Sequence, residues 1–171
     1  DVGAEFHRAA FLESGGLVAF EAEHFTGSWD NADGTSWRRV PDAAGEPTHI
    51  VVDGSQPRAT WETGAEVSYL IRFSTPGTYY VHARVMAEDA SSDSFLFGLG
   101  TVQLGTGHSG ASAGWMWDND ESEGIPIPSE GLYTLTLRRR EDNLQIDRIV
   151  LTTDRSAAFS DDEPIEISAL R

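Results

Sequence analysis

The sequence of 171 residues contains no cysteine and no lysine, and it has no long apolar run. The absence of cysteine excludes a disulfide scaffold, a thiolate metal site and a cysteine nucleophile. No stretch approaches the roughly 18 to 20 apolar residues that a membrane-spanning helix needs. No basic segment followed by an apolar run opens the sequence. We therefore expect a soluble chain, cut from a longer precursor.

Positive charge is also scarce. All 12 basic residues are arginine, against 28 Asp plus Glu, which gives a net charge of −16. Such a charge repels nucleic acid and anionic membranes, so we expect neither as a partner. The acidic surface is compatible with a saline setting, although genomic base composition also favours arginine over lysine. The one basic run, Arg138 to Arg140, is followed by two acidic residues and is predicted to be a solvated turn; the alternative is a contact with a uronate or a sulfate ester.

Short alternating runs punctuated by Gly, Pro, Asp and Ser recur along the chain, whereas helical periodicity is scarce. With 39% apolar residues, the length suits one domain with its own core. The pattern predicts an all-β fold, an antiparallel β-sandwich. The predicted strands are 16–24, 37–41, 48–52, 67–74, 78–86, 94–99, 113–117, 125–127, 131–139 and 145–152.

Two features refine this interpretation. Pro76-Gly77 fits the centre of a type II turn, and the flanking runs 68–73 and 78–85 are predicted to form a hairpin. The domain itself is predicted to cover residues 16–153. Residues 1–15 are expected to be an approach segment, and residues 154–171 have the composition of a linker.

Three carboxylates are candidates for a metal site. Asp147 lies inside an apolar strand, so it must face solvent or be neutralised, because an unpaired buried charge is very costly. Glu21 and Glu23 are two residues apart and point to one side of a strand. Three acidic oxygen donors without a local partner indicate one hard cation such as calcium. The alternative is that the glutamates form an exposed polar face and Asp147 pairs with Arg148 or Arg138.

Five tryptophans exceed what a core of this size normally uses. The C–H patches of a pyranose ring lie flat on aromatic faces and leave the hydroxyl groups for polar side chains. Trp115 and Trp117 place two indoles on one face of a predicted strand, and the turn near Asn143 and Gln145 supplies amides. The alternative for each indole is core packing. Trp29, in a Gly-Asp-Asn-rich loop, is expected to be exposed.

In this order, the motifs resemble carbohydrate-binding module families 6 and 35 and the sugar-binding-like C-terminal domain of family 115 glycoside hydrolases. The resemblance covers roughly residues 16–153. It rests on Glu-Ala-Glu in the first strand, the aromatic strands around Pro76-Gly77, the Trp-x-Trp strand, Gly-x-Tyr-x-Leu-x-Leu and the closing Ile-Asp-Arg-Ile-Val-Leu. It implies a jelly roll with a structural calcium, held by Glu21, Glu23, Asp147 and a backbone carbonyl from around residues 37–39.

The same resemblance implies a sugar site. One aromatic would be Trp61 and the other Trp115 or Trp117. Gln145 stands where these modules usually carry asparagine, which leaves Asn143 as the alternative for that contact. The implied function is non-catalytic binding of an oligo- or polysaccharide by a secreted, monomeric module, which targets an attached enzyme or surface protein to its substrate.

The sequence offers no constellation for catalysis. The five histidines lack zinc-ligand spacing, and neither a Gly-x-Ser-x-Gly elbow nor a phosphate loop is present. Glu21 and Glu23 lie side by side and cannot flank a scissile bond. Two alternatives stay open: a small jelly-roll polysaccharide lyase that uses the stripe Tyr80, His82 and Arg84, or a protein-binding cell-surface domain with an apolar patch.

Overall fold

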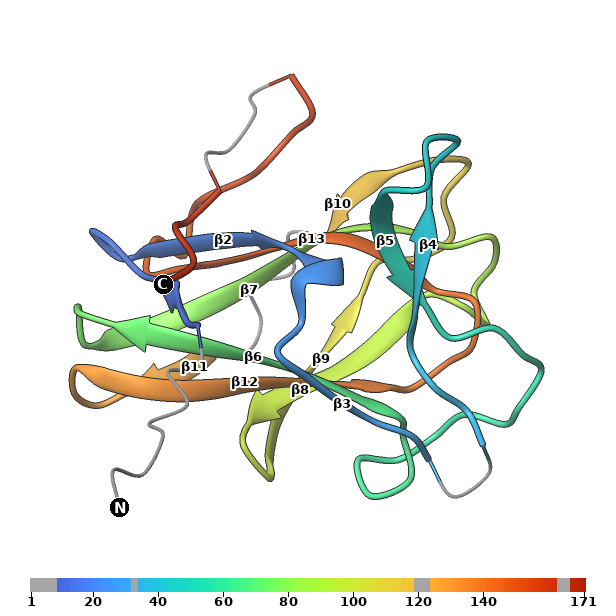
Figure 1. The fold of residues 1–171 in the computed structure, drawn as a ribbon, viewed down its shortest axis with the longest axis horizontal. Helices are drawn as coiled ribbons and strands as arrows, with labels where there is room; N and C mark the ends of the chain where they lie inside the picture. The colour runs from blue at the N-terminus through green and yellow to red at the C-terminus, as the bar shows by residue number, and fades with distance from the viewer. Residues whose placement is uncertain (1–8, 32–33, 119–123, 163–166) are drawn as a thin grey trace, which may run out of the picture.

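The computed structural model describes residues 9–31, 34–118, 124–162 and 167–171, which form two β-sheets packed face to face (Figure 1). This arrangement confirms the predicted β-sandwich. Sheet A has the strand order β1-β6-β12-β8-β9, with β3 also on β6, and sheet B has the order β10-β7-β13-β5-β4, with β11 also on β7 and β2 on β13. No helix among the described residues is long and apolar enough to cross a membrane.

Most strand bounds follow the predicted pattern, and the sequence analysis missed β1, β3 and β9. Two predicted strands need correction: the run 16–24 ends as a strand at Glu21, so Glu23 lies in a 3-10 helix and does not share a strand face with Glu21, and the run 113–117 is a strand only from Met116, which leaves Trp115 outside it. Sheet A consists of β1 (Phe11–Leu12), β3 (Gly27–Trp29), β6 (Glu66–Phe73), β8 (Ser94–Leu99), β9 (Val102–His108) and β12 (Gly131–Arg139). Sheet B consists of β2 (Leu17–Glu21), β4 (Arg38–Pro41), β5 (Pro47–Val51), β7 (Gly77–Met86), β10 (Met116–Asp118), β11 (Gly124–Ile127) and β13 (Gln145–Thr152). A short 3-10 helix, η1 (Ala22–His24), follows β2.

The turn at Pro76-Gly77 joins the two sheets, which corrects the predicted hairpin. β6 pairs with β12 in sheet A, whereas β7 pairs with β13 in sheet B. Alternate side chains of both strands are buried in the shared core, among them Tyr69 and Ile71 on β6 and Tyr79 and Val85 on β7. Alternation marks the inward face of each strand but does not say whether the next strand lies beside it or opposite it.

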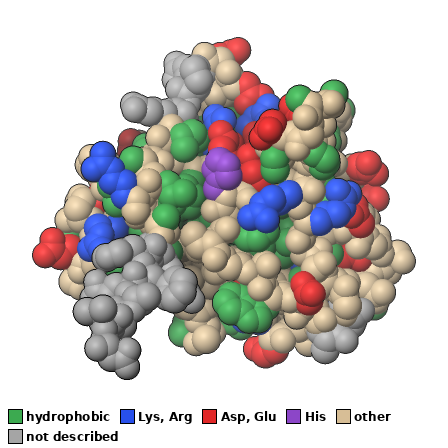
Figure 2. All heavy atoms as spheres, in the orientation of Figure 1, with side chains coloured by type: hydrophobic (Ala, Val, Ile, Leu, Met, Phe, Trp, Pro, Cys, Tyr) green, Lys and Arg blue, Asp and Glu red, His purple; other side chains and the backbone are tan. Residues whose placement is uncertain are grey.

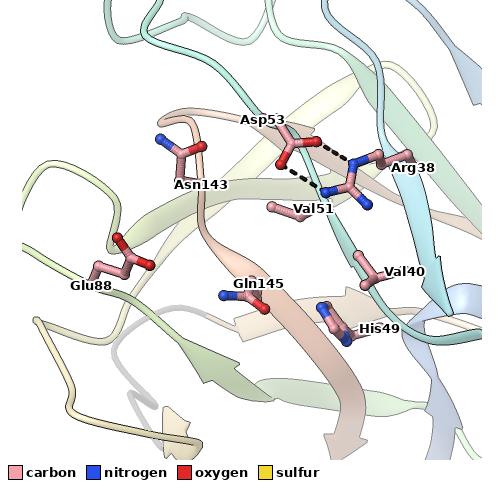
Figure 3. Close-up of a pocket in the computed structure, with 8 residues that line it drawn as sticks. All are labelled: Arg38, Val40, His49, Val51, Asp53, Glu88, Asn143 and Gln145. Atoms are coloured by element: carbon pink, nitrogen blue, oxygen red, sulfur yellow. Dashed lines mark hydrogen bonds and ion pairs between the residues drawn. The ribbon is translucent and has the colours of Figure 1, made fainter. Parts of the chain in front are cut away.

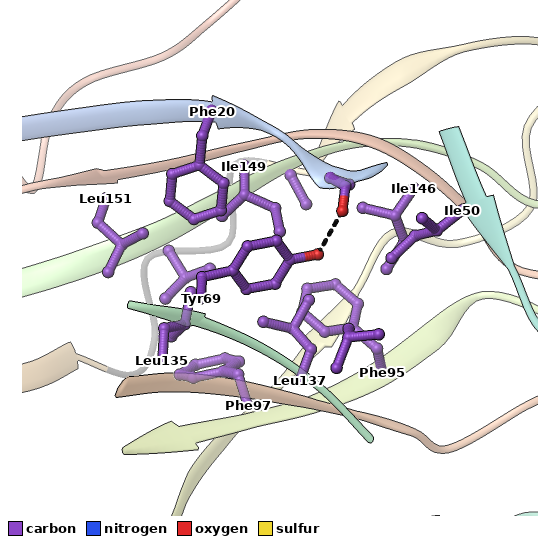
Figure 4. Packing of buried hydrophobic residues seen from close by; sticks show 14 of the residues in the cluster. Phe20, Ile50, Tyr69, Phe95, Phe97, Leu135, Leu137, Ile146, Ile149 and Leu151 are labelled. Atoms are coloured by element: carbon purple, nitrogen blue, oxygen red, sulfur yellow. Dashed lines mark hydrogen bonds between the residues drawn. The ribbon is translucent and has the colours of Figure 1, made fainter. Parts of the chain in front are cut away.

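Aromatic rings dominate the core between the sheets (Figure 4). Phe20 stacks on Phe11 with ring centroids 4.5 Å apart and contacts Tyr69 at 4.7 Å. The buried Tyr69 hydroxyl donates a 2.7 Å hydrogen bond to the carbonyl oxygen of Ala22 in η1. Because a buried hydroxyl needs a partner, this bond fixes the end of β2 and with it the chain that carries Glu23.

A β-bulge in β13 decides where Asp147 points. The register with β7 shifts between Ile146 and Arg148, so Asp147 is the extra residue. Ile146 and Ile149 are both fully buried, and strict alternation between them would force one to the outside. The bulge allows both isoleucines to face the core while the Asp147 carboxylate stays partly exposed.

The predicted solvated turn at residues 138–142 is largely buried, which corrects that expectation. Arg139 is 2% exposed, and Glu141 and Asp142 are each 5% exposed. An Arg139 guanidinium N–H donates to Asp142 Oδ1 at 2.5 Å, and Arg138 pairs with Glu66 at 2.5 Å. The run forms internal ion pairs, so these arginines do not offer free guanidiniums to a uronate or a sulfate.

The C-terminal residues pack on the sandwich, although their composition is that of a linker. Ser168 N–H donates to the carbonyl oxygen of Ala19 on β2, and its hydroxyl accepts from Ala19 N–H. Arg171 and Ala10 exchange two backbone hydrogen bonds of 2.6 and 3.0 Å. Both ends of the described chain therefore lie together, away from β4 and β5 (Figure 1).

Candidate sugar-binding site

A pocket of about 370 Å³ opens on the outer face of sheet B, where β4, β5 and β13 lie side by side (Figure 3). The strand register places alternate residues of neighbouring strands in rows: Arg38 lies opposite Val51, and Val51 lies opposite Gln145. Side chains in one row point to the same face of a sheet. The pocket is lined by Arg38, Val40, His49, Val51, Asp53, Glu88, Asn143 and Gln145.

Trp115 lies beside this pocket. Its ring meets that of His49, a lining residue, edge to face, with centroids 5.3 Å apart. The guanidinium of Arg84 lies 5.1 Å from the centre of the Trp115 ring. The indole is partly exposed, one residue before β10. A planar aromatic side chain therefore borders a pocket that is lined mostly by polar side chains, a combination that suits a sugar.

Two of the charged residues that line the pocket are paired with each other. Arg38 forms a two-point ion pair with Asp53, in which its terminal N–H donates to Asp53 Oδ1 at 2.9 Å. Burial lowers the pKa of His49, against the raising effect of the nearby Asp147 carboxylate, and so favours the neutral imidazole. On the face of the molecule that Figure 2 shows, basic and acidic side chains lie among one another.

The two predicted amides, Asn143 and Gln145, differ in their hydrogen bonds and in their position at the pocket. Asn143 adopts a left-handed backbone, φ 67°, and exchanges two side-chain hydrogen bonds with Gly54, at 3.2 and 2.9 Å. These bonds occupy both ends of the Asn143 amide. Gln145 lines the pocket between Asn143 and His49 (Figure 3), and its side chain hydrogen-bonds the His49 imidazole. It is the better placed amide for a ligand, and Asn143 shapes the rim.

The other predicted aromatics do not join Trp115 at this pocket. Trp61 is only 7% exposed, its indole N–H donates to the carbonyl oxygen of Thr101, and Arg138 covers its ring at 4.7 Å. Trp61 therefore packs against sheet A and has no open face for a sugar, so we leave it out of the proposed site. Trp117 is half-buried and packs against Phe159, with ring centroids 5.4 Å apart.

The three predicted metal ligands lie near one another, but two of them are already paired. Glu21 forms a 2.7 Å ion pair with Arg148, and Asp147 forms one of 2.7 Å with Arg84. The premise that these acids lack partners is thus wrong for Glu21 and Asp147. Within the described part of the chain, no group of three His, Asp or Glu side chains is placed to hold a metal ion.

Glu23 is the carboxylate that fits a cation. It is 6% exposed, and among the residues that the structure describes its buried Oε2 atom has no hydrogen-bond partner. Burial, together with the neighbouring Glu21 and Asp147 carboxylates, raises the pKa of Glu23 to about 7. A cation bound beside this buried oxygen would relieve the repulsion among the three carboxylates, but Glu21 and Asp147 would first have to turn from their arginine partners toward it.

Sequence reasoning missed four polar residues of the pocket: Arg38, His49, Asp53 and Glu88. Arg38-Arg39-Val40 and His49-Ile50-Val51 do alternate in the strand pattern, which marks Arg38, Val40, His49 and Val51 as one face of a hairpin. This alternation can be seen in the sequence alone. β5 and β13 are adjacent because of long-range strand pairing, which the local sequence pattern does not predict.

Comparison with solved structures identifies the fold as that of carbohydrate-binding modules of families 6, 35 and 36. The C-terminal family 6 module of a marine laminarinase from Zobellia galactanivorans superposes with a TM-score of 0.55 at 21% identity, over 80% of this chain and 98% of that one. A family 36 module in complex with calcium and xylotriose superposes with a TM-score of 0.51 at 17% identity, over 79% and 99%.

Two sequence comparisons add to the likeness. The model of the glycosyl hydrolase family 115 C-terminal domain matches residues 10–94. Uncharacterized protein P23 of Formosa agariphila is 26% identical over 90% of this chain. The aligned region covers 48% of that protein, so the chain spans about half the length of this relative.

Proposed function

We propose that this chain is a non-catalytic carbohydrate-binding module with its sugar site at the pocket beside Trp115. The observation that carries the proposal is the combination of a partly exposed indole with the amide of Gln145 at the rim of one polar pocket. An aromatic face takes the C–H side of a pyranose, and an amide both donates to and accepts from its hydroxyl groups. The shared fold of oligosaccharide-binding modules supports this function.

The proposed role is delivery. Weak, reversible binding by a module raises the local concentration of whatever is attached to it on the same polysaccharide. We propose a secreted parent protein in which a catalytic domain or a surface protein is attached to this module, which acts as a monomer. The family 115 match supports a glycoside hydrolase as that parent.

The geometry does not favour the lyase alternative. His82 is fully buried and packs against Phe159, with ring centroids 4.8 Å apart. Arg84 is paired with Asp147 and Asp161. The stripe that a lyase would use is therefore covered by the chain itself. Incubation with uronate polymers should produce no new ultraviolet absorbance, since no chain is cleaved by elimination.

The Trp115→Ala substitution tests the sugar site. On a glycan array of neutral, uronate-containing and sulfated oligosaccharides, we expect the parent to bind at least one class. Loss of the stacking face should weaken that interaction, measured by titration calorimetry, by about thirtyfold or more. Trp29→Ala is the matched control, because Trp29 is 62% exposed on β3 of the other sheet. Equal binding by parent and Trp115→Ala would place the site elsewhere.

We also propose that a structural calcium is held by Glu23 together with Glu21 and Asp147. When bound, the ion supplies positive charge that allows three neighbouring carboxylates to stay ionised. Glu23 contributes the oxygen for which the described part of the chain offers no hydrogen-bond partner. The Asp147 bulge brings the last strand to the same place, since Asp147 and Glu21 both act on the charge of Glu23.

Calcium should raise the melting temperature of protein first treated with a chelator. A ligand at a hundredfold excess over its Kd stabilises by about 2.7 kcal/mol, which is about 5 to 10 °C for a domain of this size. Glu23→Gln should remove most of this response, and Glu130→Gln, exposed between β11 and β12, should keep it. An unchanged melting temperature of the parent on calcium addition would refute the site.

A further inference from the structure

The C-terminal segment, residues 154–162, follows β7 across the outer face of sheet B. Tyr80, His82 and Arg84 alternate on β7 and so share that face. Three residues of the segment contact them in the same order: the Arg155 guanidinium lies 5.6 Å from the centre of the Tyr80 ring, Phe159 packs on His82, and Asp161 pairs with Arg84. The segment is thus docked in a defined register along the strand.

Two anchors near the end of this segment are specific. The Phe159 ring lies between those of His82 and Trp117, at 4.8 and 5.4 Å. Asp161 accepts two hydrogen bonds from Arg84, one from Nε at 2.7 Å and one from a terminal nitrogen at 2.8 Å. A two-point contact of this kind fixes the orientation of a guanidinium plane, which a single bond does not.

Arg84 connects the segment to the proposed sugar site. Its remaining terminal nitrogen donates to Asp147 Oδ2 at 2.7 Å, and its guanidinium lies over the Trp115 ring. Trp115 precedes β10, so the strand ladder does not hold its side chain. The described contacts that hold this indole are the guanidinium of Arg84 and the edge of His49.

We propose that Asp161 and Arg84 are positioning residues for the sugar site, and that the C-terminal segment is therefore part of the binding unit. Asp161 locks the plane of Arg84, and Arg84 supports one side of the Trp115 ring, which leaves the ring oriented for a ligand. This inference rests on the proposed function for its effect on affinity. Its effect on the Trp115 ring stands without a ligand.

Asp161→Asn is the direct test, because asparagine keeps the shape of the side chain and removes its charge and one acceptor. A ring that is no longer held must be ordered when the ligand binds, so we expect the Kd for the best array glycan to rise about three- to tenfold. Asp162→Asn is the matched control: it removes the same charge from the next, exposed residue of the segment. We expect Asp162→Asn to bind like the parent.

The near-ultraviolet circular dichroism of Trp115 gives a second measurement that needs no sugar. The Trp115 signal is the difference between each protein and its Trp115→Phe counterpart. We expect Asp161→Asn to reduce this difference and Asp162→Asn to preserve it. If Asp161→Asn instead caused a general loss of structure, the aromatic signal would fall both in Asp161→Asn and in its Trp115→Phe counterpart. The melting temperature of Asp161→Asn would fall as well.

The outcomes separate the two proposals. If Asp161→Asn leaves both the Trp115 signal and the Kd as in Asp162→Asn, the positioning role is refuted. If no array glycan binds the parent but the Trp115 signal still depends on Asp161, the positioning role stands and the sugar function fails. Arg84→Lys, which keeps the charge but cannot make the two-point contact, should behave like Asp161→Asn; normal binding and a normal signal there would contradict the proposal.

Discussion

We expect the Asp142→Ala substitution to lower the free energy of unfolding by about 3 to 5 kcal/mol, because it leaves the charge of Arg139 buried without its partner. The two side chains are only 4% and 2% exposed. Asp142 also accepts a 2.6 Å hydrogen bond from the backbone N–H of Gln56. The substitution therefore removes two interactions from a buried site.

Urea unfolding of the parent, Asp142→Ala and Asp162→Ala would measure this effect. Asp162 is exposed, and we expect its substitution to change the free energy of unfolding by less than about 0.5 kcal/mol. Asp142→Ala should also weaken glycan binding, since the segment that Asp142 holds at Gln56 leads back to the pocket residue Asp53. A loss of stability below about 1 kcal/mol would mean that the buried pair contributes little.

The second large effect is expected at Glu13, a buried carboxylate that joins the start of the chain to the turn between β6 and β7. It is 4% exposed and accepts four hydrogen bonds: from Gly16 N–H at 2.6 Å, Ser74 N–H at 2.7 Å, and the Ser74 hydroxyl and Thr75 N–H, both at 2.8 Å. Glu13→Gln offers one acceptor in place of two and brings an N–H group among donors. We expect a loss of about 2 to 3 kcal/mol in the free energy of unfolding.

The pH dependence of this difference has a defined sign. Burial opposes ionisation of Glu13, but the hydrogen bonds from Ser74, Gly16 and Thr75 outweigh it and lower the pKa. A carboxylate whose pKa is lower in the folded state stabilises the fold above its unfolded pKa, about 4.3, and this stabilisation is lost as the pH falls through the folded pKa. The gap between parent and Glu13→Gln should thus be full at pH 7 and narrow below pH 4, as measured by urea unfolding at each pH. Glu46→Gln, exposed between β4 and β5, is the control with no such gap; a gap that widens in acid would contradict the assignment.

The sequence was sufficient for the sandwich, because each strand carries its own alternation. It was not sufficient for the partners of each strand. A turn at Pro76-Gly77 can join two strands of one sheet or strands of two different sheets. The pairing of β6 with β12 and of β7 with β13 shows that it joins different sheets. The same limit applies to the pocket, which β4, β5 and β13 form together.

The site was predicted in part. Trp115 and Gln145 were selected for their chemistry, and they lie at one pocket with Asn143 at its rim. Trp61 was also selected for its chemistry, but it does not lie at the pocket. An indole is equally suited to a sugar and to a core, and the choice depends on whether another side chain, here Arg138, covers it. The alternative for Asp147 named Arg148 or Arg138 as its partner, whereas the partner is Arg84. Arg148 pairs with Glu21, and residues far apart in sequence provide both partners.

The hydrogen bonds between Ala10 and Arg171 have a consequence for how this domain can be joined to others. Ala10 and Arg171 lie side by side, whereas β4 and β5, which carry the pocket on their outer face, lie at the other end of the sandwich (Figure 1). A domain attached at either terminus would extend from the end of the sandwich that is remote from β4 and β5. The front would stay clear to approach a solid, insoluble surface.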